Sequence, residues 1–447
     1  MDYELRRATP ADAQGIFETQ VDAFGIADNP LRLERARASS FGRPQAHIVM
    51  VDETGRVVGV VHIGDEWINV GRCAVLKGDV GHVSIRTELQ GLGLGTRMMR
   101  WTVAHLRAHG YHLSRLGGLV RFYSRFGYEP FPRRFVEMNL SGVHGVRRRI
   151  STVEAYPEPD GLFPGTIRPY DDARDFQARV RLRYGLYGAR SGAWRVPAEA
   201  ESPAHPAAPD PEALAWLYER DGAVRAYLLA VESPLEARGE ETVFSITDFA
   251  YDQAYPDAAA AVVRKLLAHV APHEPGRITS RLPFDEMLAE ALQLGGVYFE
   301  RKETYQAVAS NMIMVVNLAA TLRQVVPELT VRLANSLVAG WEGAIEVAIP
   351  ARGACPGGDP TTVTAGEALQ GEAVRLVIAG GEVTVAEEPG PVDLALQMTQ
   401  AQFVKALFGI AALSELAPAR TIELTPTQRA LLDALFPRTQ TGCGPWG

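Results

Sequence analysis

The chain has 447 residues, of which 47% are hydrophobic and 22% are charged. These proportions exclude a disordered chain and suit a globular protein of about three domains. The longest apolar runs, such as Met312–Val316, are much shorter than the roughly 20 residues of a membrane span. The charged start of the chain lacks the apolar core of a secretory signal. Because the three cysteines are scattered and indicate no disulfide framework, we expect a soluble, cytoplasmic protein.

The net charge of −8 is unevenly distributed along the chain. Residues 97–150 contain eleven arginines and only two acidic residues, Glu129 and Glu137, so the remainder is strongly acidic. A local basic block in an acidic protein indicates a polyanion bound at one place, although a solvated arginine-rich surface would have the same composition. No long basic face continues elsewhere, so we expect no nucleic-acid partner.

Strand and helix signals alternate over residues 1–150. Thr9 is a good N-cap, and Pro10 opens a helix that runs to about Phe24. A second helix starts at Gly95 and ends before Gly110. The expected strands are Tyr3–Ala8, Ala46–Val51, Val57–Ile63, Val80–Ile85, His112–Leu116 and Phe135–Leu140, with a short helix at Arg121–Phe126. This order predicts an α/β domain with mixed strand pairing.

Residues 151–310 repeat this order more loosely, and a proline-rich stretch at 197–211 is expected to form a loop. The expected strands are Thr166–Pro169, Ala223–Val231, Val243–Ala250 and Ile278–Leu282, and the expected helices are Asp171–Tyr184 and Asp257–His269. Residues 311–447 differ, because strands followed by helices suggest an α+β sandwich. Its expected strands are Met312–Asn317, Leu329–Leu333, Ala344–Ile349, Ala373–Ala379 and Glu382–Ala386, and its expected helices are Ala319–Val326 (ended by Pro327), Thr399–Gly409 and Thr425–Phe436.

A glycine-rich segment joins the expected strand Val80–Ile85 to the helix from Gly95. Glycines at alternate positions let successive N–H groups point at one anion, and the helix N-terminus adds its own donors. The pattern predicts a pyrophosphate cradle. The residues of this cradle are Gly91, Leu92, Gly93, Leu94, Gly95 and Thr96.

Other nucleotide-binding loops match this segment less well. A Walker A loop is excluded, because no Gly-Lys-Ser/Thr sequence occurs. A dinucleotide site would need a third glycine where Thr96 stands, and an acidic residue about 20 positions further on, where none occurs. A merely tight glycine turn would give the same pattern.

Two motifs carry a resemblance to a known family. Gln90, Gly93 and Gly95 match the pattern Gln/Arg-x-x-Gly-x-Gly/Ala, and Phe122–Tyr128 follows about 30 residues later. The first resembles the acetyl-CoA loop of the GNAT N-acetyltransferases, and the second resembles their Tyr-x-x-x-Gly-Phe/Tyr element. The resemblance implies that an amine attacks acetyl-CoA directly and that Tyr123 protonates the departing thiolate. Ordinary packing among aromatic neighbours is the other interpretation of Tyr123.

The same resemblance implies coenzyme contacts on two strands. They are the strand-edge groups of Val83, Ser84 and Ile85 and the backbone of Gly118 and Leu119. The equivalent loop of the second region, Tyr251–Asp257, has no glycine and two carboxylates, so we expect no coenzyme there.

The resemblance extends over the whole chain. Asp393–Gly409 resembles the sterol-carrier-protein-like fold. An active GNAT domain (1–150), a degenerate GNAT-like domain (151–310) and a sterol-carrier-protein-2-like domain (311–447) are similar in order to the Eis family. This implies an N-acetyltransferase that acts on a primary amine, such as an aminoglycoside, a polyamine or lysine, and that forms a homohexamer. An acidic protein concentrates cations, so we expect a small cationic acceptor.

In that family the general base is the C-terminal carboxylate, which corresponds to Gly447. The family commonly ends in an aromatic residue, whereas this chain ends in glycine, so Glu88, Asp65 and Glu66 are alternative bases. A different class of function also fits the same motifs, namely a non-catalytic acyl-CoA or lipid-binding protein.

Three histidines have a spacing that could suit a metal ion: His105, His109 and His112. Gly110 ends the helix between them and no cysteine or carboxylate is near, so we expect no metal. Imidazoles at a helix C-terminus instead complement the helix dipole. Arg147–Arg149 is read as a solvated linker, and Cys73 has no sequence argument for a nucleophilic role.

Overall fold

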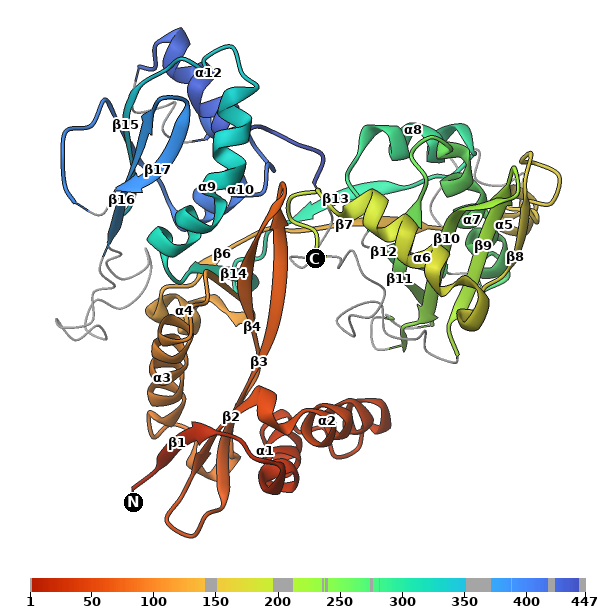
Figure 1. The fold of residues 1–447 in the computed structure, drawn as a ribbon. Coiled ribbons are helices and arrows are strands. Elements are labelled where there is room, and N and C mark those ends of the chain that lie inside the picture. The colour runs from red at the N-terminus through yellow and green to blue at the C-terminus, as the bar shows by residue number, and fades with distance from the viewer. Residues whose placement is uncertain are drawn as a thin grey trace.

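The computed structural model describes residues 2–140, 151–195, 212–234, 237, 240–273, 276–280, 282–350, 371–386, 388–416 and 423–441. Within these ranges the chain forms three sheets, each accompanied by helices (Figure 1). No helix in the described ranges combines the length and the apolar character needed to cross a membrane. The predicted loop at 197–211, the run Arg147–Arg149 and Gly447 all lie outside the described residues.

The first sheet has seven strands in the order β1-β2-β3-β4-β5-β14-β6. Their bounds are Glu4–Arg7 (β1), His47–Val51 (β2), Val57–Val70 (β3), Cys73–Ile85 (β4), Leu113–Leu119 (β5), Ala309–Val315 (β14) and Glu129–Pro130 (β6). The helices beside this sheet are α1 (Ala13–Phe24), α2 (Pro30–Gly42), α3 (Leu94–Ala108) and α4 (Val120–Tyr123). The strand β4 runs antiparallel to β3 and parallel to β5.

The helices α1 and α3 cover opposite faces of this sheet. Ile16 of α1 packs with Val49 and Val60 of the central strands. Met98 of α3 packs with residues on the other side of the same strands, such as Met50. Because side chains alternate along a strand, each central residue can be assigned to the α1 face or to the α3 face.

The second sheet places equivalent strands in the same order, β8-β9-β10-β11-β12-β7-β13. Their bounds are Thr166–Pro169 (β8), Leu214–Arg220 (β9), Ala223–Glu232 (β10), Thr242–Tyr251 (β11), Gly276–Ser280 (β12), Arg133–Asn139 (β7) and Glu300–Thr304 (β13). The helices of this region are α5 (Thr152–Ala155), α6 (Asp172–Tyr187), α7 (Pro256–Val270) and α8 (Glu286–Leu294). The looser repeat expected from the sequence is therefore visible strand by strand.

Each of these two sheets contains one strand from outside its own stretch of sequence. β7, predicted as the last strand of the first region, pairs with β12 and β13 of the second sheet. β14, predicted as the first strand of the third region, pairs with β5 and β6 of the first sheet. Both strands exist as predicted, but their assignment to those regions was wrong. Apolar patterning identifies a buried strand and does not identify its partner.

The third sheet has the order β17-β16-β15-β18 and packs against three helices. The strands are β15 (Gly343–Ile349), β16 (Glu372–Ala379), β17 (Glu382–Ala386) and β18 (Leu394–Gln397), and the helices are α9 (Leu318–Ala334), α10 (Gln400–Leu407) and α12 (Pro426–Leu435). Its core continues into Ile68, Val75 and Leu113 of the first sheet. The third region therefore shares a hydrophobic core with the end of the first sheet that carries the tip of the β3–β4 hairpin.

The helix α9 corrects two predictions. Pro327 lies inside this helix and does not end it, and the strand predicted at Leu329–Leu333 is wrong. The buried apolar stripe of α9 consists of Leu318, Leu322, Val325, Leu329 and Leu333. Val331 is 38% exposed, which fits a helix and not an apolar strand. Burial of one continuous stripe outweighs the hydrogen bond that proline cannot donate.

The hairpin of β3 and β4 is longer than the sequence predicts, and its tip contacts both other regions. The tip is a two-residue turn in which Gly71 has a φ of +55°. Gly71 N–H donates to Ser191 Oγ at 2.9 Å, and Arg72 N–H donates to Glu328 Oε2 at 3.0 Å. The first sheet thus connects the second and third regions through one turn.

Candidate acetyl-CoA site

The glycine-rich loop has the backbone conformation that an anion cradle requires. Gly91 and Gly93 have φ angles of +82° and +79°, and Gly93 is the N-cap of α3. A Cβ atom at either position would meet no described atom within 4 Å, so the loop is open on that side. Left-handed backbone favours glycine, and the first turn of a helix has N–H groups without internal partners. The local geometry therefore suits a pyrophosphate.

Only part of the arginine block lies beside this loop. The Arg125 guanidinium stacks over the Phe122 ring at 4.9 Å and its Nη2 lies 3.5 Å from Thr96 Oγ1. In contrast, Arg97 donates to the Tyr3 carbonyl and Arg115 donates to Asn311. The block is therefore divided, and Arg125 is the member that the described contacts place at the start of α3.

Next to the loop, the parallel strands β4 and β5 diverge. Their ladder runs from the pair Lys77–Leu113 to the pair Val80–Leu116 and then ends. Beyond it, β4 continues to Ile85 paired with β3, and β5 continues to Leu119 paired with β14. A wedge therefore opens between residues 81–85 and 117–119. The predicted coenzyme contacts stand on its two sides: Val83, Ser84 and Ile85 on β4, and Gly118 and Leu119 on β5.

A β-bulge marks the point of divergence. His62 of β3 faces Gly81, while Val60 faces Ser84, so two residues of β4 oppose one of β3. His82 within this bulge has a φ of +50°, which is uncommon for a residue with a side chain. The sequence analysis missed the bulge, because nothing in a short run of strand residues signals an extra one.

Tyr123 lies directly against the β5 side of the wedge. A Cβ atom on Gly118 would lie 2.3 Å from Tyr123 Cε2, so this glycine makes room for the ring. The ring also packs edge to face with Phe122 at 4.9 Å, as the packing interpretation expects. Burial raises the pKa of Tyr123 to about 12. The phenol therefore stays protonated at neutral pH and holds a proton that could be donated.

Ser84 Oγ and Gln20 Nε2 are among the buried polar atoms that have no hydrogen-bond partner within the described part of the chain. Ser84 pairs with Val60 across the strands, which assigns its side chain to the α1 face. Buried polar groups are rarely left unsatisfied, and those that are can mark a ligand site.

The alternative bases all have partners. Glu88 forms an exposed ion pair with Arg56 at 2.8 Å. Asp65 accepts a hydrogen bond from Tyr111 Oη at 2.5 Å, and Glu66 Oε2 lies 2.6 Å from Lys77 Nζ. Gly447 lies outside the described residues, so the structure places no carboxylate for it.

The three histidines considered for a metal do not converge. The rings of His105 and His109 stack at 3.8 Å. His112 Nδ1 instead accepts a hydrogen bond from the Leu76 N–H at 2.9 Å, in the neighbouring strand. Burial lowers the pKa of His105 to about 4, which favours its neutral form. Within the described ranges, no three potential metal ligands are grouped.

Comparison with known proteins agrees with this geometry. Residues 4–131 match the family model described as an acetyltransferase (GNAT) domain. No curated protein matches the sequence significantly. Solved structures match the whole chain at low identity and show its fold.

Three of these structures cover almost all of both chains. A probable N-acyltransferase from Enterococcus faecalis is 13% identical, with a TM-score of 0.62 over 99% of this chain and 98% of that chain. A GCN5-related N-acetyltransferase from Anabaena variabilis is 14% identical, with a TM-score of 0.58 over 99% and 98%. Eis1 from Mycobacterium abscessus is 14% identical, with a TM-score of 0.52 over 98% of each chain. Residues 4–131 thus match a GNAT acetyltransferase domain, and the fold of the whole chain is similar to that of Eis1.

Proposed function

We propose that this protein transfers the acetyl group of acetyl-CoA to the primary amine of a small cationic molecule in the wedge between β4 and β5. One observation carries the proposal: the open loop at Gly91 and Gly93 follows the end of β4 after that strand has left β5, and it leads into α3 where a Cβ on Gly95 would lie 3.8 Å from Ile85 and 3.6 Å from Phe122. The loop N–H groups and the start of α3 bind the pyrophosphate. The edge groups of residues 83–85 bind the pantetheine arm.

Tyr123 is the general acid of this proposal. As the amine attacks the thioester carbonyl, the carbon–sulfur bond breaks and the sulfur becomes a thiolate. The Tyr123 phenol donates its proton to that thiolate. Its place beside Gly118 on β5, and the burial that keeps it protonated, both support this role.

The acceptor and the assembly are proposed on the family resemblance. An aminoglycoside, a polyamine and lysine are the candidate acceptors, and the net charge of −8 favours a cation. The base that takes the amine proton is the C-terminal carboxylate of Gly447 or a side chain of the site. We also propose a homohexamer in the cytoplasm.

The direct test is a thiol-release assay with the full chain and acetyl-CoA. The acceptors are an aminoglycoside, spermidine and a lysine peptide, each compared with acetyl-CoA alone. We expect amine-dependent release of free coenzyme with at least one class. Tight coenzyme binding without release for any acceptor would instead indicate a non-catalytic acyl-CoA or lipid-binding protein.

A further inference from the structure

Three imidazoles stand in a row across three adjacent strands of the first sheet. His47 of β2 lies directly opposite His62 of β3, and their ring centroids are 5.0 Å apart. The His62 ring is 5.7 Å from the ring of His82 on β4. The three positions are far apart in sequence, so no motif groups them.

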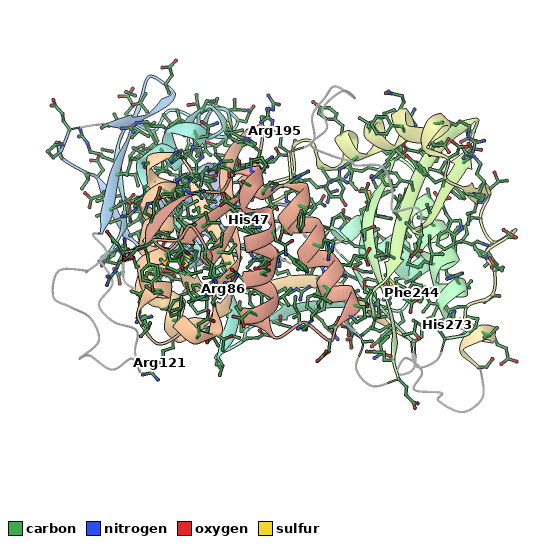
Figure 2. All side chains as sticks on the ribbon, turned by 90° about the horizontal axis from the view of Figure 1, so that it is seen from below. His47, Arg86, Arg121, Arg195, Phe244 and His273 are labelled. Carbon is green, nitrogen blue, oxygen red and sulfur yellow. The ribbon has the colours of Figure 1, made fainter. Side chains whose placement is uncertain are left out.

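The row ends in the wedge, on the face opposite to Tyr123. His47 and His62 each lie two residues from a member of the core on the α1 face, Val49 and Val60. Side chains alternate, so both imidazoles also lie on the α1 face. Tyr123 packs against the core on the α3 face. Figure 2 shows α1 and α2 across this side of the molecule, with His47 beside them.

His82 forms the open end of the row. It is exposed, it lies in the bulge, and it is two residues beyond Val80, where β4 leaves β5. Ser84 and Gln20, which both carry a buried polar atom without a partner in the described structure, lie on the α1 face and on α1 itself. A ligand that enters from the α1 side therefore meets an imidazole at the mouth of the wedge.

The surroundings favour the neutral form of each ring. Burial lowers the pKa of His62, and the His82 imidazole and Arg43 at the end of α2 add to this, while Asp79 of β4 and Asp65 of β3 oppose it.

The pKa values of the two other imidazoles, His82 and His47, are also lowered. The His82 side chain reaches the surface, but the protein atoms around its ring partly desolvate it and lower its pKa. Burial also lowers the pKa of His47 to about 4, with help from the two other imidazoles. His47 Nδ1 lies 3.2 Å from the Pro44 carbonyl, and its Nε2 lies 3.4 Å from Ser39 Oγ. All three rings are thus in the neutral form near pH 7, in which one ring nitrogen is an acceptor.

We propose that His82 is the general base for the acceptor amine and that His62 is a positioning residue that stabilises the imidazolium of His82 by sharing its proton. The proposal rests on the acetyltransferase function proposed above. It assigns to His82 the role that the family resemblance gives to Gly447.

The protons balance over the reaction. An ammonium group loses one proton to His82, and the free amine then attacks the thioester carbonyl from the α1 face. The carbon–nitrogen bond forms, the carbon–sulfur bond breaks, and Tyr123 protonates the thiolate on the other face. The attacking nitrogen loses its second proton as the amide forms, which restores the Tyr123 phenol. The proton on His82 passes to solvent, so one proton is released per turnover.

The test measures kcat and KM against pH from about 6 to 10 for the full chain and for His82→Asn. Asparagine tolerates the left-handed backbone at this position, so the bulge can persist. Near pH 7 we expect kcat to fall by about 100-fold with little change in the KM for acetyl-CoA. The loss should shrink at high pH, where the amine is already free. His62→Gln should shift the acidic limb of the profile and cost less.

A matched control and a rescue separate this chemistry from a structural role. His269 faces His273 at 6.2 Å in the second region, and His269→Gln should leave the profile unchanged. His82→Gly also suits the positive φ, and imidazole added to the buffer should restore part of its rate.

Three outcomes would overturn the proposal. They are an unchanged profile for His82→Asn, a loss that is equal at all pH values, and a lack of rescue in His82→Gly. The absence of thiol release by the unmodified chain would contradict the proposed function itself, so the two failures can be told apart.

Discussion

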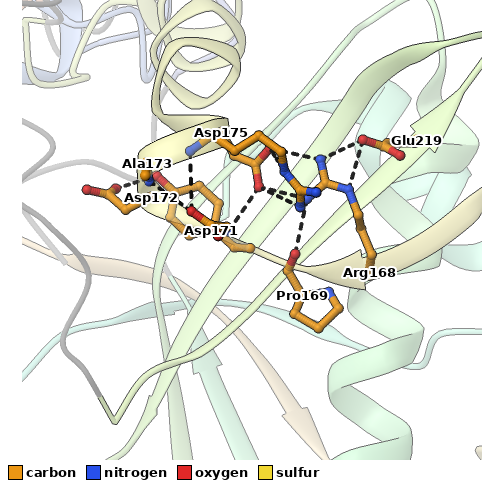
Figure 3. Close-up of polar contacts among 9 residues, drawn as sticks. Arg168, Pro169, Asp171, Asp172, Ala173, Asp175 and Glu219 are labelled. Atoms are coloured by element: carbon orange, nitrogen blue, oxygen red, sulfur yellow. Dashed lines mark hydrogen bonds and ion pairs between the residues drawn. The ribbon is translucent and has the colours of Figure 1, made fainter.

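The first and second sheets place equivalent strands in the same order, and they begin with the same polar contact. In the first, Arg6 of β1 binds Asp12 at the start of the next helix with two hydrogen bonds of 2.8 and 2.9 Å. In the second, Arg168 of β8 binds Asp175 of α6 with two bonds of 2.7 and 2.8 Å, and it also contacts Glu219 (Figure 3). The scaffold is therefore duplicated down to individual ion pairs.

The loops that precede α3 and α7 show where the two copies differ. The first is open, with glycines in left-handed conformation. In the second, Arg225 bonds to Asp252 at 2.9 Å and stacks over Tyr255 at 4.0 Å. Asp257 likewise bonds to Arg220 at 2.9 Å. The two carboxylates that would repel a phosphate are thus neutralised within the protein, and an aromatic side chain occupies the helix start.

The strands differ in the same way. β11 also has a register shift, and the buried Asp248 beside it binds Arg179, Arg183 and Tyr227. The equivalent part of the first sheet has neutral imidazoles and polar groups without partners in the described structure. At this point of the second sheet Asp248 is paired with two arginines, whereas Ser84 Oγ in the first sheet has no partner in the described structure. This difference, and not the strand order, distinguishes the first copy from the second.

The largest expected effect comes from the group that only the first copy uses for chemistry. Tyr123→Phe removes the proposed acid and keeps the ring against Gly118. We expect kcat to fall by at least about 100-fold, because general acid catalysis contributes about 10²–10⁴-fold. Thiol release measures the rate, and calorimetry with acetyl-CoA should show nearly unchanged affinity. Unchanged turnover would remove Tyr123 from the chemistry.

The second effect concerns the buried ion pairs that Asp248 forms in the second sheet. Asp248→Asn leaves two buried arginines without their shared carboxylate, and we expect unfolding to become easier by about 3–5 kcal/mol. Asp172 is the matched control, because it is exposed and lies 4.0 Å from the same Arg179. Asp172→Asn should cost at most about 1 kcal/mol in urea unfolding. Equal losses would show that the buried cluster does not stabilise the second sheet.

A third effect compares two glycines with the same strain. Gly93 and Gly222 have φ angles of +79° and +70°, and a Cβ atom at either would meet nothing within 4 Å. Alanine at either position should therefore lower the free energy of unfolding by about 1–2 kcal/mol, and by a similar amount in both variants. Only Gly93→Ala should weaken acetyl-CoA binding, by about tenfold, because it lies in the cradle. Equal coenzyme affinity in both variants would argue against a cradle at this loop.

The features that could be predicted from the sequence are those formed by residues close together in the chain. The glycine loop and the aromatic segment around Tyr123 are short motifs, and they lie next to each other in the structure. The row of His47, His62 and His82 depends on strand register, which a pattern of residue types does not specify. The exchange of β7 and β14 escaped prediction for the same reason.

A fourth effect tests whether the duplicated ion pair is equally important in both copies. The hydrogen bonds from Arg6 lower the pKa of Asp12 to about 2. Burial opposes the same shift in Asp175, but the hydrogen bonds from Arg168, the Asp171 N–H and Arg174 together outweigh it, and its pKa is also about 2. An unfolded aspartate has a pKa of about 3.9, so the unfolded chain binds more protons between these values. The stabilisation is complete above about pH 5 and is lost as the pH falls towards 2.

Replacing each aspartate by asparagine removes this stabilisation at neutral pH and keeps an oxygen acceptor for the helix start. Arg168 retains Glu219 at 2.5 Å, whereas the hydrogen bonds described for Arg6 reach only Asp12 and the Arg7 carbonyl. Asp12→Asn should therefore cost about 2 kcal/mol and Asp175→Asn less, measured by urea unfolding at pH 7. For both variants the difference from the unmodified chain should shrink as the pH approaches 3. A difference that is independent of pH would mean that the aspartates act through shape and not through charge.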